Sequence, residues 1–345
     1  MLALQKTKPG LGLELRDVAP PEAPAPHEVL IEVAATGICG SDLHIEDWTD
    51  MYQSFMGAAL PVTIGHETAG RVVQRGGAVT GINVGDRVVI NPAVACGTCP
   101  SCIAGDMDDC RNRQAIGMVR NGAFAQLVLA PAQFAYQIPD NVPTELAALA
   151  EPLTTSAHAL ATADMSAGKR VVVFGPGPIG QGAAILARQM GASDVVVVGM
   201  DDPARFATLR ALGFDRLVDM ASHDAADQLS RLSGDGFDIA VEAAGVPAVI
   251  DQALSVLRPW GILAAAGMPE KPASFDVLRL VRNRLQIRGV SRTPHSAWMT
   301  VLSAMAKDPA AFAPMITHRL PLKDALDGFA LCHQRVASKV LLYPG

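Results

Sequence analysis

The feature that most constrains the fold is a run of β-branched residues that leads into a glycine-rich turn and a helical pattern. Residues 169–192, KRVVVFGPGPIGQGAAILARQMGA, predict a strand, a tight turn and an amphipathic helix. A second apolar run, DVVVVG at 194–199, follows and predicts the next strand. Strands that alternate with helices in this order are typical of a parallel, doubly wound α/β sheet.

The turn GPGPIG matches the pattern G-x-G-x-x-G of dinucleotide-binding turns. Gly175 allows the chain to turn, Gly177 leaves room for a pyrophosphate, and Gly180 lets the helix pack closely on the strand. The first turn of the helix then offers free backbone N–H groups to phosphate oxygens. We therefore predict that a dinucleotide contacts Gly175, Gly177, Pro178, Ile179 and Gly180. The alternative is a glycine-rich loop that binds no ligand.

The character of the sequence changes at about residue 153. The part before it is rich in Gly and Pro and contains short apolar runs such as HEVLIEVAA and GDRVVINP, which predict a twisted, barrel-like β domain. From 154 to 290, strand-like runs such as FDIAVEAAG and LQIRGV alternate with helical stretches. Residues 291–345 begin with a helical pattern and end in a short apolar strand. The predicted fold class is therefore α/β, with a β domain followed by a doubly wound parallel sheet.

Four of the six cysteines stand in one loop, between residues 95 and 111. Their spacing, C-x2-C-x2-C-x7-C, can bring four thiolates onto one tetrahedral zinc ion, which then has no open coordination position. The sequence therefore predicts a structural zinc held by Cys96, Cys99, Cys102 and Cys110. An iron–sulfur cluster, which also uses four thiolates, and a set of unrelated free thiols are the alternatives.

A second set of metal-ligating residue types is spread over the first half of the chain. Cys39 lies in GICGSDLH, His66 and Glu67 lie in IGHETAG, and the segment LAEPLTTSAH contains Glu151. One Cys, one His and one or two carboxylates form a mixed set suited to a catalytic zinc, which keeps a position for water or substrate. Taken singly, a small buried thiol and a hydrogen-bonded histidine would also explain Cys39 and His66.

Charge and hydropathy argue against two classes of partner. The chain has 28 basic and 34 acidic residues, a formal net charge of −6 and no basic block, which argues against nucleic acid. Gly, Pro, Gln and Asn interrupt its apolar runs, so none predicts a membrane span. The segment MLALQKTKPGLG lacks the layout of a secretion signal. We therefore expect a cytoplasmic protein, in which reduced thiols favour metal binding over disulfides.

Together these motifs resemble those of the zinc-dependent medium-chain alcohol and polyol dehydrogenases. The resemblance covers essentially the whole chain, from GICGSDLH through GHETAG, the four-cysteine loop and EPL to GPGPIG. It implies a GroES-like β-barrel domain at 1–153 with a structural-zinc lobe at 95–111, a Rossmann NAD(P)-binding domain at 154–290, and a segment at 291–345 that returns to the first domain. It also implies two zinc ions per chain, one catalytic and one structural, and a homodimer or homotetramer.

The resemblance assigns the ligands of the catalytic zinc. Cys39 and His66 correspond to two of them. Glu67 corresponds to the carboxylate ligand of the polyol branch. Glu151 corresponds to a carboxylate that binds the metal directly or through water and exchanges during turnover.

Three polar residues after Cys39 complete the catalytic residues that the resemblance implies. Ser41 corresponds to a hydroxyl that contacts the substrate oxygen, and Asp42 to a carboxylate that orients the histidine ligand. His44 corresponds to the last member of a proton relay, with a plain surface histidine as the alternative. Zinc lowers the pKa of a coordinated hydroxyl, so the neighbouring carbon can give a hydride to nicotinamide. The implied reaction is the reversible oxidation of an alcohol to a carbonyl compound.

The choice between NAD and NADP depends on the residues after the second predicted strand. An acidic residue about 20 positions beyond the glycines usually holds the adenosine ribose of NAD. In VVVVGMDDPAR, Gly199 stands where polyol dehydrogenases usually have that acid, and Asp201 and Asp202 follow it. No arginine stands at the turn to receive a 2′-phosphate. We expect NAD, held by Asp201, with NADP as the alternative cofactor and helix N-capping as the alternative role of one aspartate.

The expected substrate is a small secondary alcohol with a neighbouring polar group, such as a polyol or sugar alcohol, because two glutamates fit the polyol group better than simple primary-alcohol enzymes. The stretch SDLHIEDW is similar to that of threonine dehydrogenases, which typically carry a His shortly before the cysteine loop; this chain has NPAVAC there. L-Threonine 3-dehydrogenase-like activity is therefore the alternative reaction. A non-catalytic zinc-containing redox sensor and a zinc-free quinone or enoyl reductase are the rival functions, and the complete set of ligand types argues against both.

Overall fold

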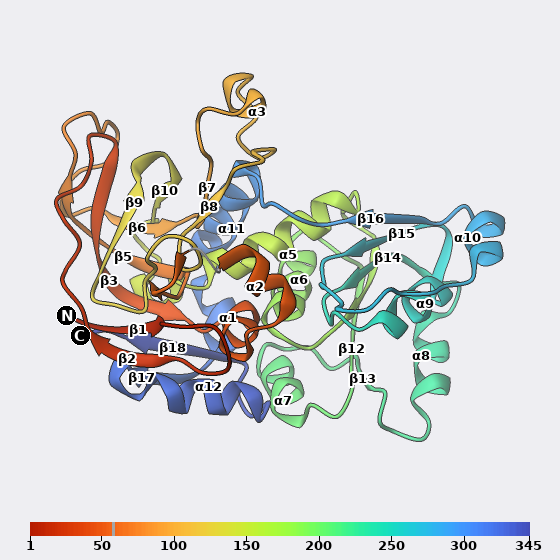
Figure 1. The fold of residues 1–345 in the computed structure, drawn as a ribbon. Helices are drawn as coiled ribbons and strands as arrows, with labels where there is room; N and C mark the ends of the chain where they lie inside the picture. Colours follow the sequence, from red (N-terminus) through yellow and green to blue (C-terminus); the bar gives the residue numbers. More distant parts are fainter. Residues whose placement is uncertain (57–58) are drawn as a thin grey trace. The chain divides into compact units, whose positions relative to one another are not determined.

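A computed structural model describes residues 1–56 and 59–345 of the chain. The chain divides into two compact units. The first comprises residues 1–151, 305–309 and 316–345, and the second comprises 152–304 and 310–315. Both ends of the chain therefore belong to the first unit, where they lie close together (Figure 1).

The larger sheet of the first unit joins segments that are far apart in the sequence. Its strands are β3 (Glu28–Gly37), β5 (Glu67–Arg75), β6 (Arg87–Ile90), β9 (Leu127–Pro131), β10 (Ala135–Gln137), β17 (Ile316–Pro321) and β18 (Lys339–Tyr343). The main path runs β10-β6-β5-β3-β18-β17, and β9 also pairs with β3. Antiparallel pairing with β5, β9 and β18 makes β3 the central strand of this unit.

The remaining elements of the first unit are short. A three-stranded sheet in the order β2-β1-β4 and a hairpin complete the strands: β1 (Leu2–Lys6), β2 (Glu14–Asp17), β4 (Val62–Thr63), β7 (Ala93–Val94) and β8 (Gln114–Ala115). The α-helices are α1 (Gly40–Asp47), α2 (Asp50–Met56), α3 (Pro100–Ile103), α4 (Thr144–Ala147) and α12 (Ala325–His333), and η2 (Ala132–Phe134) and η4 (Leu322–Asp324) are 3-10 turns. The β7–β8 hairpin leads into a lobe that contains α3 and extends away from the sheets of this unit (Figure 1).

The sequence of β3 explains why this strand lies at the centre of the sheet. Val29, Ile31 and Val33 point into one hydrophobic core, while Glu32 between them is exposed. This alternation is typical of a strand with one buried face. Burial of each aliphatic side chain stabilises the fold by about 1.5–3 kcal/mol. The strand ends at Gly37, so the sheet fixes the position at which Cys39 follows.

The second unit contains a six-stranded parallel sheet, which confirms the predicted doubly wound α/β class. Its strands are β11 (Arg170–Phe174), β12 (Asp194–Gly199), β13 (Leu217–Asp219), β14 (Phe237–Glu242), β15 (Leu257–Ala265) and β16 (Gln286–Gly289). Their order is β13-β12-β11-β14-β15-β16, and every neighbouring pair is parallel. The chain crosses from β13 to the other side of β11 at β14, and ligands of such sheets bind at this switch point.

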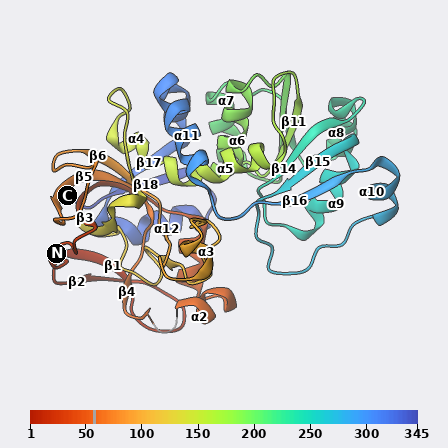
Figure 2. The same ribbon diagram turned by 90° about the horizontal axis from the view of Figure 1, so that it is seen from above.

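Helices cover both faces of the parallel sheet, which is why its strands are continuous apolar runs. The helices are α5 (Ala150–Thr162), α6 (Pro178–Gln189), α7 (Pro203–Ala211), α8 (Ala225–Ser233), α9 (Pro247–Ser255), α10 (Val277–Asn283) and α11 (His295–Lys307), with the 3-10 helix η3 (Pro309–Met315) after them. Figure 2 shows α6 and α7 on one side of the strands and α9 and α10 on the other. Val171, Val172 and Val173 of β11 are accordingly fully buried.

Candidate active site and structural metal centre

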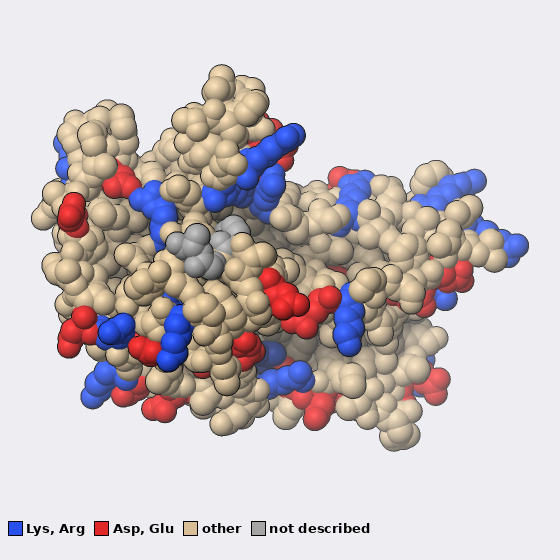
Figure 3. All heavy atoms as spheres, viewed as in Figure 1, with Lys and Arg blue, Asp and Glu red and all other residues tan. Residues whose placement is uncertain are grey.

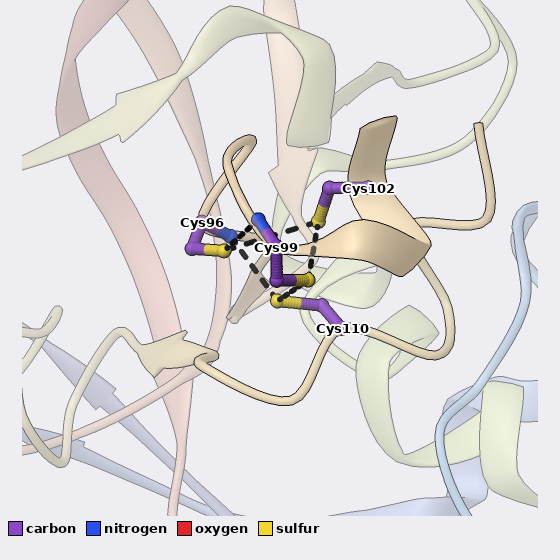
Figure 4. Close-up of side chains that lie close together, drawn as sticks. All are labelled: Cys96, Cys99, Cys102 and Cys110. Carbon is purple, nitrogen blue, oxygen red and sulfur yellow. Dashed lines mark hydrogen bonds between the residues drawn. The ribbon is translucent and has the colours of Figure 1, made fainter. Parts of the chain in front are cut away.

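The four predicted structural cysteines converge in the lobe (Figure 4). Their Sγ atoms all lie within 4.8 Å of one another. The Sγ–Sγ distance is 3.5 Å from Cys99 to Cys102, 3.9 Å from Cys99 to Cys110, and 4.0 Å from Cys96 to Cys102. A tetrahedral zinc with Zn–S bonds of about 2.3 Å needs sulfur–sulfur distances of about 3.8 Å. The four side chains therefore fit a zinc ion and leave no position for a substrate.

Local hydrogen bonds to the sulfur atoms favour thiolates in this cluster, which a cation can bind. The Cys99 N–H donates to Cys96 Sγ at 3.4 Å, and the Cys96 N–H donates to Cys110 Sγ at 3.3 Å. Hydrogen bonds from the backbone and side chain of Thr98 lower the pKa of Cys96 to about 6. Burial, together with the neighbouring thiols, raises the pKa of Cys102 to about 12. Crowded thiols cannot all ionise on their own, so a bound cation is what would complete the cluster.

Cys39 and two further predicted residues lie around the start of α1. Cys39 follows β3 and is the N-cap of α1, whose first turn carries Ser41 and Asp42. Asp42 Oδ2 accepts a hydrogen bond from the Cys39 N–H at 2.9 Å. This contact closes the first turn, as in a capping box, and fixes the backbone that carries the thiol.

His66 lies beside this turn and is almost fully buried. Its Nε2 is 3.2 Å from Ser41 Oγ, and its Nδ1 is 3.4 Å from Asp42 Oδ1. The Nδ1–Oδ1 pair is slightly too long or bent for a hydrogen bond, and neither atom has a hydrogen-bond partner elsewhere among the described residues. Burial acts to lower the pKa of His66, but the Asp42 carboxylate and the Cys39 side chain hold that pKa well above its usual range. These surroundings favour positive charge at the imidazole ring, which a metal bound at Nε2 would supply. Asp42 faces the other ring nitrogen and orients the ring.

Glu151 belongs to the same group of side chains. It lies in the first turn of α5 and interacts electrostatically with His66, Glu67 and Asp42. Burial raises the pKa of Glu151 to about 7, and the nearby carboxylates contribute to this rise. His66 and Lys339 act in the opposite direction and favour the ionised carboxylate. A divalent metal bound by Cys39, His66 and Glu151 would favour it in the same way.

Glu67 is held by a residue that the sequence reasoning did not identify. Lys339 Nζ donates to Glu67 Oε1 at 2.7 Å and to Oε2 at 2.6 Å, and both side chains are buried. Among the described residues, only the four-cysteine cluster has three or more potential ligand atoms all within 4.8 Å of one another. The assignment of Glu67 as a zinc ligand therefore stays a prediction. A lysine within the apolar run SKVLLY is the signal that could have identified Lys339.

Tyr52 is a second residue of this site that the sequence did not indicate. It is 5% exposed, lies on α2, and interacts with the side chain of Ser41. Burial raises the pKa of Tyr52 to about 12, so its hydroxyl stays protonated at neutral pH and can donate. Its ring stacks on His44, with 6.3 Å between ring centroids and 11° between planes. His44 itself is exposed, which suits the solvent end of a proton path.

The glycine turn of the second unit has the geometry that its sequence predicted. Gly175 has φ +111°, and a Cβ at this position would lie 2.8 Å from Ala243 O. A Cβ at Gly180 would lie 1.8 Å from Gly175 O. At Gly177, the N-cap of α6, a Cβ would meet nothing within 4 Å. Close packing therefore requires glycine at 175 and 180. Gly177 instead faces open space that a phosphate can enter.

The acidic residues after β12 are separated into two roles. Asp202 caps α7 by accepting from the Arg205 N–H at 3.2 Å, and it pairs with Arg205 Nη1 at 3.0 Å. Asp201 is exposed and has φ +49°, and its N–H donates to Asp219 Oδ1 at 2.9 Å. A Cβ at Gly199 would lie 2.8 Å from the Phe206 ring. An acid cannot occupy position 199 without displacing this packing, which explains why the aspartates come later.

Glu242 is a buried carboxylate at the carboxyl end of β14 that sequence reasoning missed. Its Oε1 accepts hydrogen bonds from the N–H groups of Ala244 and Gly245 at 2.8 and 2.7 Å. Because Ala243 packs against Gly175, Glu242 fixes the loop beside the dinucleotide turn. An acid at the end of the apolar run FDIAV was the available signal.

Comparisons with known proteins identify the family of the chain. The alcohol dehydrogenase GroES-like domain matches residues 25–140, and the zinc-binding dehydrogenase domain matches residues 178–307. The L-threonine 3-dehydrogenase of Idiomarina loihiensis is 33% identical over 344 residues, which are 99% of each chain. This chain belongs to the zinc-dependent alcohol dehydrogenase family. The predicted oxidoreductase class of this dehydrogenase, with zinc and NAD(P) as cofactors and a small-molecule substrate, is thereby confirmed.

Solved structures support the same assignment for the whole chain. The 2R,3R-butanediol dehydrogenase of Bacillus subtilis has a TM-score of 0.89 and 27% identity, and the match covers 100% of this chain and 99% of that one. A zinc-binding dehydrogenase of Sinorhizobium meliloti bound to NADP has a TM-score of 0.84 and 29% identity, with 99% of each chain covered. The galactitol-1-phosphate dehydrogenase of Escherichia coli has a TM-score of 0.88 and 25% identity, with 100% of both chains covered.

Two further observations concern binding to nucleic acid and to membranes. Figure 3 shows lysines and arginines interspersed with acidic side chains on one face of the molecule. Within the described ranges, no helix has the length and hydropathy needed to cross a bilayer.

Proposed function

We propose that this dehydrogenase oxidises a secondary alcohol with a neighbouring polar group to a ketone, with NAD as the hydride acceptor, and catalyses the reverse reaction as well. The observation that carries the proposal is the convergence of Cys39, Ser41 and His66, with Asp42 behind the histidine, at the end of β3. Threonine, 2,3-butanediol and galactitol, which appear in the names of similar proteins, each have a polar group next to a secondary hydroxyl.

Each residue of the site has a separate task in this proposal. Cys39, His66 and Glu151 would hold a zinc ion, which as a Lewis acid lowers the pKa of the substrate hydroxyl. Asp42 keeps the His66 ring oriented through Nδ1. Ser41 Oγ would relay the hydroxyl proton, accepting it while it gives up its own proton, and the exposed His44 would release a proton to solvent.

The residues after β12 favour NAD over NADP. Asp201 offers an exposed carboxylate to the ribose hydroxyls, which a 2′-phosphate would repel. Arg205, the nearest arginine in sequence, is already paired with Asp202 at the start of α7. We therefore expect Asp201→Ala to raise the KM for NAD severalfold while the KM for NADP falls or stays constant. A KM for NAD that does not change would remove Asp201 from the cofactor site.

A substrate panel tests the proposed reaction. Reduced nicotinamide is followed with 2,3-butanediol, sorbitol, L-threonine and 2-butanol as substrates, each with NAD and with NADP. We expect the highest kcat/KM with a vicinal diol or polyol and NAD, and loss of turnover in Cys39→Ser. Preference for L-threonine would favour the alternative reaction instead. Turnover that survives removal of zinc would contradict the proposal.

The sheet of the second unit supports a homodimer. Strand β16 is at the edge of the sheet, and α10 next to it exposes Val277, Leu278 and Val281 by 61%, 58% and 63%. Unpaired edges and exposed apolar side chains of this kind are suited to a second copy of the chain. Light scattering should give a dimer, or a tetramer built from dimers, and Val281→Glu should lower its mass.

We also propose that the protein functions in the cytoplasm, where thiols stay reduced. The four-cysteine cluster needs reduced thiols to bind a metal.

A further inference from the structure

We propose that Lys339 is a positioning residue of the catalytic site, which holds Glu67 as a buried counter-charge and keeps it from serving as a zinc ligand. The inference rests on the proposed function in that it assumes a metal at Cys39 and His66. It reassigns Glu67 and adds a residue from the last strand of the chain to the site.

The contacts of Lys339 account for the whole ammonium group. Its Nζ donates to both oxygens of Glu67, at 2.7 and 2.6 Å, and to Ile38 O at 2.9 Å. An ammonium has three N–H donors, and here three acceptors surround it. Because the two side chains are only 2% and 1% exposed, water cannot replace either partner. A buried pair of this kind is costly to break, since the remaining charge loses its compensation.

The same lysine fixes the backbone that carries Cys39. The Ile38 carbonyl accepts from Lys339 Nζ, and the Ile38 N–H donates to Val340 O at 3.0 Å. Both polar backbone groups of the residue before Cys39 are therefore bound to β18. Cys39 is the next residue, so the position of its thiol depends on Lys339 even though the lysine is not expected to contact the metal.

The space around Glu67 is shaped for the paired carboxylate. A Cβ at Gly37 would lie 2.1 Å from Glu67 Oε2, so any larger residue at position 37 would displace the carboxylate. Glycine at the end of β3 thus makes room for Glu67 in the conformation that Lys339 holds. The site provides three other ligand types, Cys39, His66 and Glu151, which are enough for a catalytic zinc with one open position.

Cobalt substitution separates a ligand from a counter-charge. Co²⁺ is exchanged into the catalytic site while the four-cysteine site keeps zinc, and the visible bands absent in Cys39→Ser report on the catalytic ligands. We expect Glu67→Gln to lower the Tm, because the charge of Lys339 loses its compensation, but to leave these bands unchanged. The amide oxygen of Gln can still accept from Lys339 Nζ, so the contact of Lys339 with Ile38 is kept. We expect Lys339→Met to alter them, because the freed carboxylate reaches the metal and the Cys39 backbone is no longer fixed, and to reduce cobalt retention about 10- to 100-fold.

The double variant and a surface control complete the test. Glu67→Gln combined with Lys339→Met should restore the bands toward those of the native enzyme, because it removes the charge that Lys339 controls. Lys323→Met, at an exposed lysine of the same unit, should change nothing. If Glu67→Gln alone shifts the bands, Glu67 is a ligand and the inference is wrong. This single variant decides the point even if Lys339→Met does not fold.

Activity measurements keep this inference apart from the proposed function. If the cobalt bands behave as expected but no secondary alcohol is oxidised, the proposed function fails and the role of Lys339 stands. If alcohols are oxidised but Glu67→Gln shifts the bands, the role of Lys339 fails and the proposed function stands.

Discussion

The two metal-binding regions of the first unit differ in how their ligands come together. The four cysteines of the lobe lie within one loop, in which Cys96 and Cys110 are 14 positions apart. Their sulfurs already have the spacing of a tetrahedral site. The residues proposed for the catalytic site come instead from the ends of β3, β5, α5 and β18, and two of them, Asp42 and Lys339, are proposed only to position others.

We infer from this difference that the four-cysteine centre contributes to stability and the mixed centre to catalysis. A centre with four sulfur ligands has no open position, so its metal can contribute only to folding. A centre of mixed ligands, with a buried histidine, a carboxyl of raised pKa and an exposed histidine beside it, is suited to bind and release a substrate. Variants at the two regions should therefore have opposite signatures in melting temperature and in rate.

The largest effect on folding is expected for Cys99→Ser in the lobe. A metal present at about 1,000 times its dissociation constant contributes about 4 kcal/mol to folding, which corresponds to a loss of roughly 10 °C in Tm. Calorimetry and zinc analysis should show a lower Tm and one zinc fewer per chain. A stable Cys99→Ser variant with the native Tm would show that the two regions do not differ in this way.

Cys39→Ser should have the largest effect on rate. Loss of the Lewis acid removes several kcal/mol of stabilisation of the reacting oxygen, so kcat/KM should fall at least about 1,000-fold. The Tm should change much less than in Cys99→Ser, because the lobe is intact. Steady-state kinetics and calorimetry on the same preparation measure both quantities. A collapse of Tm with Cys39→Ser would mean that the catalytic site also supports the fold.

A smaller effect is expected for Tyr52→Phe, which tests whether residues outside the ligand set assist catalysis. The change removes the hydroxyl beside Ser41 and keeps the ring that stacks on His44. Loss of one hydrogen bond should lower kcat roughly 3- to 10-fold. Tyr136→Phe, at another tyrosine of the first unit, serves as the control. Equal effects of the two variants would assign Tyr52 a packing role only.

The sequence predicted local features well and long-range ones poorly. The parallel sheet, the glycine turn and the four-cysteine cluster depend on residues that are close in the chain, and each has a spacing that few other structures share. The partners Lys339 and Tyr52 were missed because no spacing relates them to Cys39 or Ser41; the pairing of β18 with β3 and the packing of α2 bring them together. The roles of Glu67 and Asp201 and the domain limits at 153 and 290 remain predictions.

The late position of Lys339 also has a consequence during protein synthesis. It is made 272 residues after Glu67, which at about 5–20 residues per second takes on the order of 10–50 s. Throughout that interval the nascent chain carries a glutamate whose cationic partner is still untranslated. The lobe cysteines emerge from the ribosome almost together, so we expect the structural zinc to be acquired during translation and the catalytic zinc only after release.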